Sequence, residues 1–174
     1  MIPHLVCYVG AGLSGRSTSL LSVMRSQGPA TEVSPGVDYF FDGLRLRLSL
    51  FRGKYWYDDP NSPTLNSSIR AEIVDVQNSD AFIFIVDSRD FRVDASSEAL
   101  EQLRSDLHAV GRELDECPVV FQFNRRDDLR AVSPGLLRER FQSKCGLQIE
   151  TVATRDEGTV AAIRALQGLL SRVL

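Results

Sequence analysis

A glycine-rich segment joins an apolar run to a helical pattern near the N-terminus, and this arrangement constrains the fold more than any other feature. Residues 4–9 form a short apolar run that suits a buried strand, and residues 10–17 read GAGLSGRS. Apolar side chains at helical spacing follow over residues 17–25. A strand, a glycine loop and a helix in this order begin an open α/β sheet, and the turn between them is where such sheets bind phosphate.

The glycine segment differs by one residue from the phosphate-loop pattern G-x-x-x-x-G-K-[ST]. We expect its amides to surround a phosphate group, and Gly10 and Gly15 to allow backbone geometry that a side chain would obstruct. The hydroxyl of Ser17 is expected to hold Mg²⁺. The expected phosphate-binding residues are Gly10, Gly12, Leu13, Ser14, Gly15, Arg16, Ser17 and Thr18.

Arg16 stands where the pattern has lysine, and it has two interpretations. Arginine is longer, planar and forked, so the exchange is not conservative and could mark the loss of tight phosphate binding. Alternatively, the substitution is tolerated in a chain that prefers arginine, because only Lys54 and Lys144 among the 20 basic residues are lysines.

Beyond the glycine loop, apolar strands alternate with helical patterns. We expect strands at 37–41, 44–51, 81–86, 119–123 and 147–152, and helices at 69–76, 98–114, 134–144 and 159–174, with an irregular segment at 52–68. The order predicts an α/β fold with a six-stranded mixed, mainly parallel sheet, one antiparallel edge hairpin and helices on both faces. Residues 1–174 are expected to form a single domain.

A second motif follows the strand at 119–123. Residues 124–127 read NRRD and match N-K-x-D, the guanine-reading signature of GTPases, again with arginine for lysine. The carboxylate of Asp127 would accept hydrogen bonds from N1–H and N2–H₂ of guanine, a donor pair that adenine lacks. Asn124 would tie the base edge to neighbouring loops, and the stem of Arg125 would pack along the base or sugar. The alternative is a solvated loop of charges.

A third element follows the last expected strand, where a backbone amide would contact the guanine oxygen. It consists of Ala153, Thr154 and Arg155.

With these elements placed, the chain resembles the MglA-type bacterial small GTPases, the Ras-like switches of cell polarity and gliding motility. Members carry a loop similar to Y-x-G-P-G-L-x-G-K-T-T, and residues 8–18 read YVGAGLSGRST. The family's Q-Y-N-K-R-D is similar to QFNRRD at 122–127, and its V-A-T-x-G-E-G to VATRDEG at 152–158. The resemblance spans nearly the whole chain and implies a Ras-like fold that binds GDP or GTP with Mg²⁺.

The chain departs from this family where hydrolysis takes place. Val37 and Asp38 occupy the positions of a cis arginine finger and of a threonine that contacts Mg²⁺, and an aspartate there would repel a γ-phosphate. Gly53 aligns with the glycine of the second switch, and Lys54 replaces the glutamine that orients water. Since a finger and a water-orienting group supply most of the acceleration, the resemblance implies a degenerate, pseudo-GTPase-like member with little or no hydrolysis and no catalytic residue assigned.

Two smaller groups of residues have expected roles outside these motifs. Tyr55, Trp56 and Tyr57 are either core residues or a patch that binds a partner. Asp75, Asp80 and Asp87 lie near the ends of expected elements, where solvation or capping is the expected role.

Three functions remain open from the sequence. The first is a degenerate GTPase acting as a regulatory or scaffolding subunit, with a Roadblock-type regulator or an active MglA-like GTPase as the partner that the resemblance implies. The second is an active switch completed by a partner in trans. The third is a nucleotide-free interaction module whose loop is filled by an Arg16–Asp38 pair.

The net charge of −3 and the absence of a basic leader, an apolar span or a lipidation motif predict a cytoplasmic protein with no nucleic acid partner and no membrane anchor.

Overall fold

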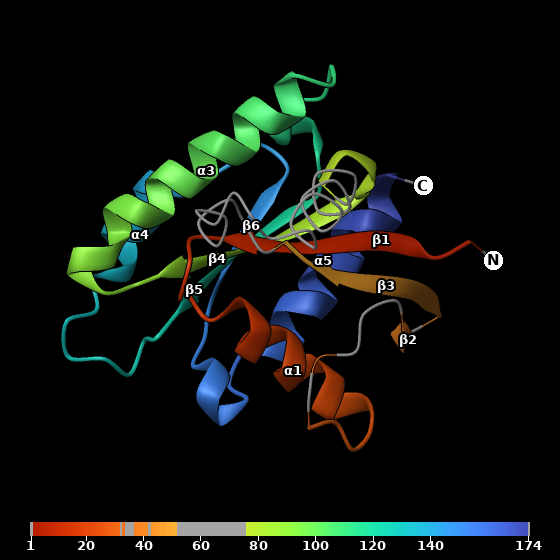
Figure 1. The fold of residues 1–174 in the computed structure, drawn as a ribbon, viewed down its shortest axis with the longest axis horizontal. Coiled ribbons are helices and arrows are strands. Elements are labelled where there is room, and N and C mark those ends of the chain that lie inside the picture. Colours follow the sequence, from red (N-terminus) through yellow and green to blue (C-terminus); the bar gives the residue numbers. More distant parts are fainter. Residues whose placement is uncertain (1, 32, 34–36, 42, 52–75, 174) are drawn as a thin grey trace, which may run out of the picture.

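A six-stranded sheet with helices on both faces forms the centre of the molecule (Figure 1). The structure, a computed structural model, describes residues 2–31, 33, 37–41, 43–51 and 76–173. The strands are β1 (His4–Gly10), β2 (Asp38–Phe41), β3 (Leu44–Leu50), β4 (Ala81–Asp87), β5 (Val119–Asn124) and β6 (Gly146–Glu150), in the spatial order β2-β3-β1-β4-β5-β6. Only the β2–β3 pair is antiparallel among the described strands, so the predicted mixed sheet with one edge hairpin is confirmed.

The helices divide into two layers (Figure 1). Their bounds are α1 (Arg16–Gln27), α3 (Val93–His108), α4 (Pro134–Arg140) and α5 (Thr159–Val173), with single turns of 3-10 helix at η2 (Asp90–Arg92), η3 (Leu114–Glu116) and η4 (Ala153–Arg155). The α1 and α5 helices bury Leu20, Val23, Ile163 and Leu166 against one face of the sheet. On the other face, α3 and α4 cover an aromatic core that includes Phe84, Phe121 and Phe141.

The hairpin alternates as the sequence predicts. Leu46 and Leu48 are buried under α1 and α5, whereas Arg45 and Arg47 lie on the opposite, partly solvated face. Alternation of this kind marks a strand with one covered face, because successive side chains point to opposite sides.

The expected helix at 98–114 has the wrong bounds. It begins five residues earlier, at Val93, and ends at His108. Gly111 has a φ of 75°, in the left-handed region, and its amide donates to the carbonyl of His108. This turn ends the helix, and it leaves Val110 on the surface and Leu114 buried in the separate turn η3.

The expected helix at 134–144 is also shorter, because α4 ends at Arg140. Its predicted start is confirmed, since Pro134 is the first helical residue and the Ser133 hydroxyl accepts from the amide of Leu136. Phe141 leaves the helix and packs 6.4 Å, centroid to centroid, from both Phe84 and Phe123. Burial of this ring therefore overrides the helical pattern that continues in the sequence. The expected helix at 69–76 falls almost wholly outside the described residues.

Candidate functional site

The glycine loop lies between β1 and α1, at the carboxyl ends of β1, β4 and β5 (Figure 1). Gly10 and Gly15 have φ values of 145° and 102°. A Cβ atom on Gly10 would lie 2.4 Å from the carbonyl oxygen of Ile85, and one on Gly15 would lie 2.3 Å from Nδ2 of Asn124. The predicted need for glycine at these two positions is therefore confirmed by both backbone conformation and space.

Three consecutive carbonyl groups of the loop are held from outside by side chains. Arg92 donates to the carbonyl of Gly12, Arg125 donates to that of Leu13 at 3.2 Å, and Asn124 donates to that of Ser14 at 3.0 Å. Among the described residues, no side chain caps the N-terminus of α1. A loop whose carbonyls face outward and whose helix begins uncapped has amide groups available for an anion.

Arg16, at the lysine position, reaches toward the end of β3. Its guanidinium donates to the carbonyl of Phe51, whose amide in turn donates to the carbonyl of Tyr8 at 3.0 Å. The arginine therefore links the start of α1 to the last described residue before position 52.

The predicted pair between Arg16 and Asp38 is wrong. Asp38 is held by Arg45 and Arg47, and the shortest Arg47 contact joins its Nε to Oδ1 at 2.8 Å. Asp38 pairs in register with Arg47, which pairs with Leu5, five residues before Gly10. At about 3.3 Å per residue, Asp38 lies roughly 16 Å back along the strands from the loop, so it does not face the phosphate position.

Asn124 joins the three segments of the predicted base site. Its Nδ2 donates to the loop, while its Oδ1 accepts from the amide of Ala153 at 3.0 Å and from the hydroxyl of Thr151 at 3.3 Å. The side chain is buried, and all these contacts lie between β5, the loop and η4. Asn124 therefore ties the neighbouring loops together, as its place in the motif predicts.

A hollow of about 430 Å³ lies between the glycine loop and the NRRD segment. The predicted residues that line it are Gly15, Thr18, Asn124, Arg125, Asp127, Ala153 and Thr154. Asp128, Leu129 and Val152 complete the lining and were missed by the sequence analysis. Leu129 is fully exposed at this hollow, and an exposed leucine five residues after a strand carries no sequence signal that would single it out.

Asp127 faces this hollow with a side chain that is one-third exposed. One carboxylate oxygen lies 3.4 Å from Nη2 of Arg155, whose own side chain is 60% exposed. A solvated ion pair of this kind contributes little to stability, so the carboxylate is available to other donors. Arg155 itself pairs with Asp127 without lining the hollow.

The expected switch positions are only partly described. Val37 precedes β2 with an exposed apolar side chain. Gly53, Lys54, Tyr55, Trp56 and Tyr57 lie outside the described residues.

Asp87 has a different role from the one expected. It is fully buried at the end of β4, and Arg89 pairs with both of its carboxylate oxygens at 2.9 and 2.6 Å. The prediction of a solvated aspartate is wrong, whereas a capping contact is present, because Oδ1 also accepts from the amide of Arg89 at 3.2 Å. The arginines that follow at positions 89 and 92 are the signal that sequence reasoning passed over. Asp80, by contrast, accepts from the amide of Leu5 at 2.7 Å on the surface, in line with a capping role.

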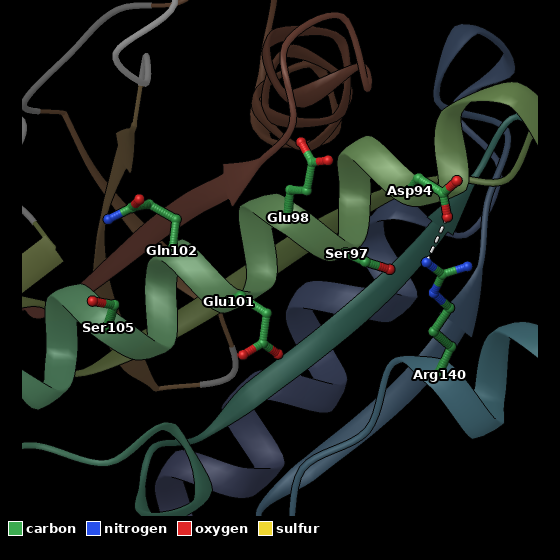
Figure 2. Close-up of a pocket in the computed structure, with 7 residues that line it drawn as sticks. All are labelled: Asp94, Ser97, Glu98, Glu101, Gln102, Ser105 and Arg140. Carbon is green, nitrogen blue, oxygen red and sulfur yellow. Dashed lines mark hydrogen bonds and ion pairs between the residues drawn. The ribbon is translucent and has the colours of Figure 1, made fainter.

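A second, larger hollow of about 610 Å³ lies on α3 (Figure 2). Its lining is polar and mainly acidic, and it consists of Asp94, Ser97, Glu98, Glu101, Gln102, Ser105 and Arg140. Arg140 is its only cation and already pairs with Asp94 at 2.6 Å. Because carboxylates repel phosphate groups, the smaller hollow beside the glycine loop is the better nucleotide site.

The residues at the smaller hollow fit a guanine nucleotide. The base side offers the carboxylate of Asp127, and the phosphate side offers an uncapped helix start. In the same loop, next to Gly10, the Ser14 hydroxyl is buried without a hydrogen-bond partner in the described part of the chain. Within that same part, no three His, Cys, Asp or Glu side chains gather as a metal site, so Mg²⁺ would be held by Ser17 together with phosphate oxygens.

No protein-family model matches the chain. It is 28% identical over 176 aligned residues, covering 95% of this chain and 89% of the relative, to the mutual gliding-motility protein MglA of Myxococcus xanthus (strain DK1622). The resemblance to the MglA-type Ras-like GTPases is confirmed. The strand order and the glycine loop agree with this MglA-like fold.

Over the described residues, no helix is both long and apolar enough to span a bilayer.

Proposed function

We propose that this MglA-like chain binds GDP or GTP across the carboxyl edge of its sheet and hydrolyses GTP slowly or not at all. The observation that carries the proposal is the single hollow that joins the glycine loop to Asn124 and Asp127. A phosphate cradle and a guanine-specific acceptor would then bind the two ends of one ligand.

Slow hydrolysis is supported by the described residues at the first switch. Val37 has an apolar side chain that supplies no positive charge. Asp38 forms ion pairs with two arginines of the hairpin. An arginine finger is worth about 10³ to 10⁵ in rate. Without that cation, and with Lys54 where the resemblance expects glutamine, little transition-state stabilisation remains.

A regulatory or scaffolding role follows from weak catalysis in a fold of this type. The resemblance to a gliding-motility protein suggests a polarity or motility system, with a Roadblock-type regulator or an active MglA-like GTPase as partner. A cytoplasmic location and a single domain over residues 1–174 belong to the same proposal.

One observation favours a second candidate, the nucleotide-free interaction module. The guanidinium of Arg16 already bonds the carbonyl of Phe51, whereas a phosphate-binding cation needs to be free to turn inward. An active switch completed in trans is the remaining alternative.

The test is the nucleotide content of the purified protein, followed by single-turnover hydrolysis. The protein is purified without added nucleotide and denatured, and the supernatant is resolved by ion exchange. Release of guanine nucleotide, with GTP turnover no faster than in buffer, would support the proposal. Fast turnover by the chain alone would contradict the degenerate assignment, and an empty protein that ignores added GDP and GTP would favour the interaction module.

A further inference from the structure

The buried carboxylate of Asp87 is the centre of an arginine cluster beside the glycine loop. Arg89 holds it through two hydrogen bonds, while Nε of Arg92 and Nε of Arg125 lie 3.7 and 3.6 Å from Oδ2. The amide of Asp87 also donates to the hydroxyl of Ser96 at 3.1 Å. One buried carboxylate therefore faces three guanidinium groups, and it is fixed to the start of α3.

Arg92 connects this carboxylate to the loop. Its Nε lies 3.7 Å from Oδ2 of Asp87, and its Nη2 donates to the carbonyl of Gly12. Its Nε is buried and makes no hydrogen bond in the described part of the chain, so its contact with Asp87 is an ion pair. The side chain is one-quarter exposed, so it is held between two acceptors that the fold places in fixed positions.

The loop needs such support because its backbone is costly to order. Gly10, Leu13 and Gly15 all have positive φ, and Leu13 at 61° adopts a conformation that L residues with a Cβ disfavour. Glycines lose more conformational freedom on ordering than other residues. A loop ordered before the ligand arrives binds more tightly, because the ordering cost is not taken from the binding free energy.

We propose that Asp87 and Arg92 act as positioning residues that order the glycine loop before nucleotide binds. Neither residue belongs to the glycine-loop or NRRD motifs. Arg92 turns the Gly12 carbonyl outward, and Asp87 holds Arg92 in place. The effect on nucleotide binding rests on the proposed function. The ordering of the loop, by contrast, is a property of the nucleotide-free protein.

Arg89 provides a matched control. It binds the same buried carboxylate, and its other contact is the ring of Phe91, 4.9 Å from the guanidinium carbon to the centroid. In the described residues it makes no hydrogen bond to the loop. The variants Arg92→Gln and Arg89→Gln each remove one cation from Asp87, but only the first removes a contact to Gly12.

The first readout uses the nucleotide-free protein. The amide of Ser14 donates to the carbonyl of Ala11 at 3.3 Å, so its hydrogen exchange by NMR reports opening of the loop. We expect exchange of this amide to rise about tenfold in Arg92→Gln and less than twofold in Arg89→Gln, since a hydrogen bond from a charged donor to the loop is lost only in the first. Equal exchange in the two variants would overturn the proposal.

The second readout is the dissociation rate of GDP carrying a fluorescent ribose label. It should rise about tenfold in Arg92→Gln and stay within twofold in Arg89→Gln. Arg92→Lys keeps a cation near Gly12 and should restore most of both readouts. A wild-type protein that binds no GDP would contradict the proposed function, whereas the exchange of Ser14 would still decide the positioning role.

Discussion

Asp127 is the side chain through which the site would select guanine. Its carboxylate faces the hollow, and in the described part of the chain it pairs with the exposed Arg155. Asp127→Ala removes two hydrogen bonds to a charged acceptor, each worth about 1.5–3 kcal/mol, so the affinity for GDP should fall roughly 100-fold or more. Isothermal titration calorimetry of the nucleotide-stripped protein measures this change.

Arg155→Ala is the matched control for that substitution. It removes the ion pair but keeps the carboxylate, and exposed pairs contribute about 0–1 kcal/mol. GDP affinity should therefore change by no more than about fivefold. A loss as large as that of Asp127→Ala would contradict base reading by Asp127.

We expect Arg16 to decide how firmly phosphates would be held at the glycine loop. Lysine at this position is too short and compact to keep the hydrogen bond to the Phe51 carbonyl, and it presents a point charge to the loop instead. Arg16→Lys should raise the affinity for GDP about tenfold, measured by titration. Arg25→Lys, at the far end of the same helix and paired with Asp156 at 2.6 Å, should leave the affinity unchanged. No gain in Arg16→Lys would show that arginine serves the loop as well as lysine does.

Among single residues, those that belong to motifs were easier to predict than the side chains that hold the motifs in place. Gly10, Gly15 and Asn124 have the geometry that their motifs require. Asp87 was misjudged because burial of a charge is decided by partners that come from other elements. The positions of Arg89 and Arg125 around it depend on the packing of η2 and the end of β5.

The β1–α1 loop is the element on which the site depends. Gly10→Ala would place a methyl group against the Ile85 carbonyl at an unfavourable φ, and should destabilise the protein by at least about 2 kcal/mol. A Cβ on Gly12 meets nothing within 4 Å among the described residues, so Gly12→Ala should cost less than about 1 kcal/mol. Urea unfolding of the two variants measures the difference. Equal loss of stability would contradict the loop geometry.

The β2–β3 hairpin should make stability depend on pH. The hydrogen bond from Arg47, followed by that from Arg45, lowers the pKa of Asp38 below its ordinary value. A carboxyl with a lowered folded-state pKa stabilises the protein above its unfolded pKa, and this contribution is lost as the pH falls through the folded value. Asp38→Asn should therefore be less stable than wild type at pH 7, and the difference should shrink below about pH 4. The urea unfolding midpoints of wild type and Asp38→Asn, measured at pH 7 and below about pH 4, test this. A difference between the two proteins that does not change with pH would argue against the arginine contacts.

Element boundaries were predicted least well where tertiary packing decides them. The apolar spacing of α3 continues in the sequence past the real end of the helix, because Leu114 returns to the core after a glycine turn. The end of α4 is set by Phe141, which enters the aromatic core instead of extending the helix. Strand positions were predicted to within two residues, since buried apolar runs directly report them.

Over the whole molecule, topology brings the parts of the site together. The central strands β1, β4 and β5 are adjacent and parallel, so their carboxyl ends meet at one edge of the sheet (Figure 1). The glycine loop, the arginine cluster and the NRRD segment each follow one of these strands. Ligands of open α/β sheets bind at this edge, and the order of elements in the sequence was sufficient to predict it. Side-chain contacts across the edge, such as Arg92 to Gly12, required the structure.

The central claim is that this edge binds a guanine nucleotide, and parallel titration of the nucleotide-stripped protein with GDP and ADP tests it most directly. Calorimetry should show one GDP bound per chain and no measurable binding of ADP, because adenine does not offer the two donors that Asp127 accepts. Binding of both nucleotides with equal affinity, or of neither, would contradict the account.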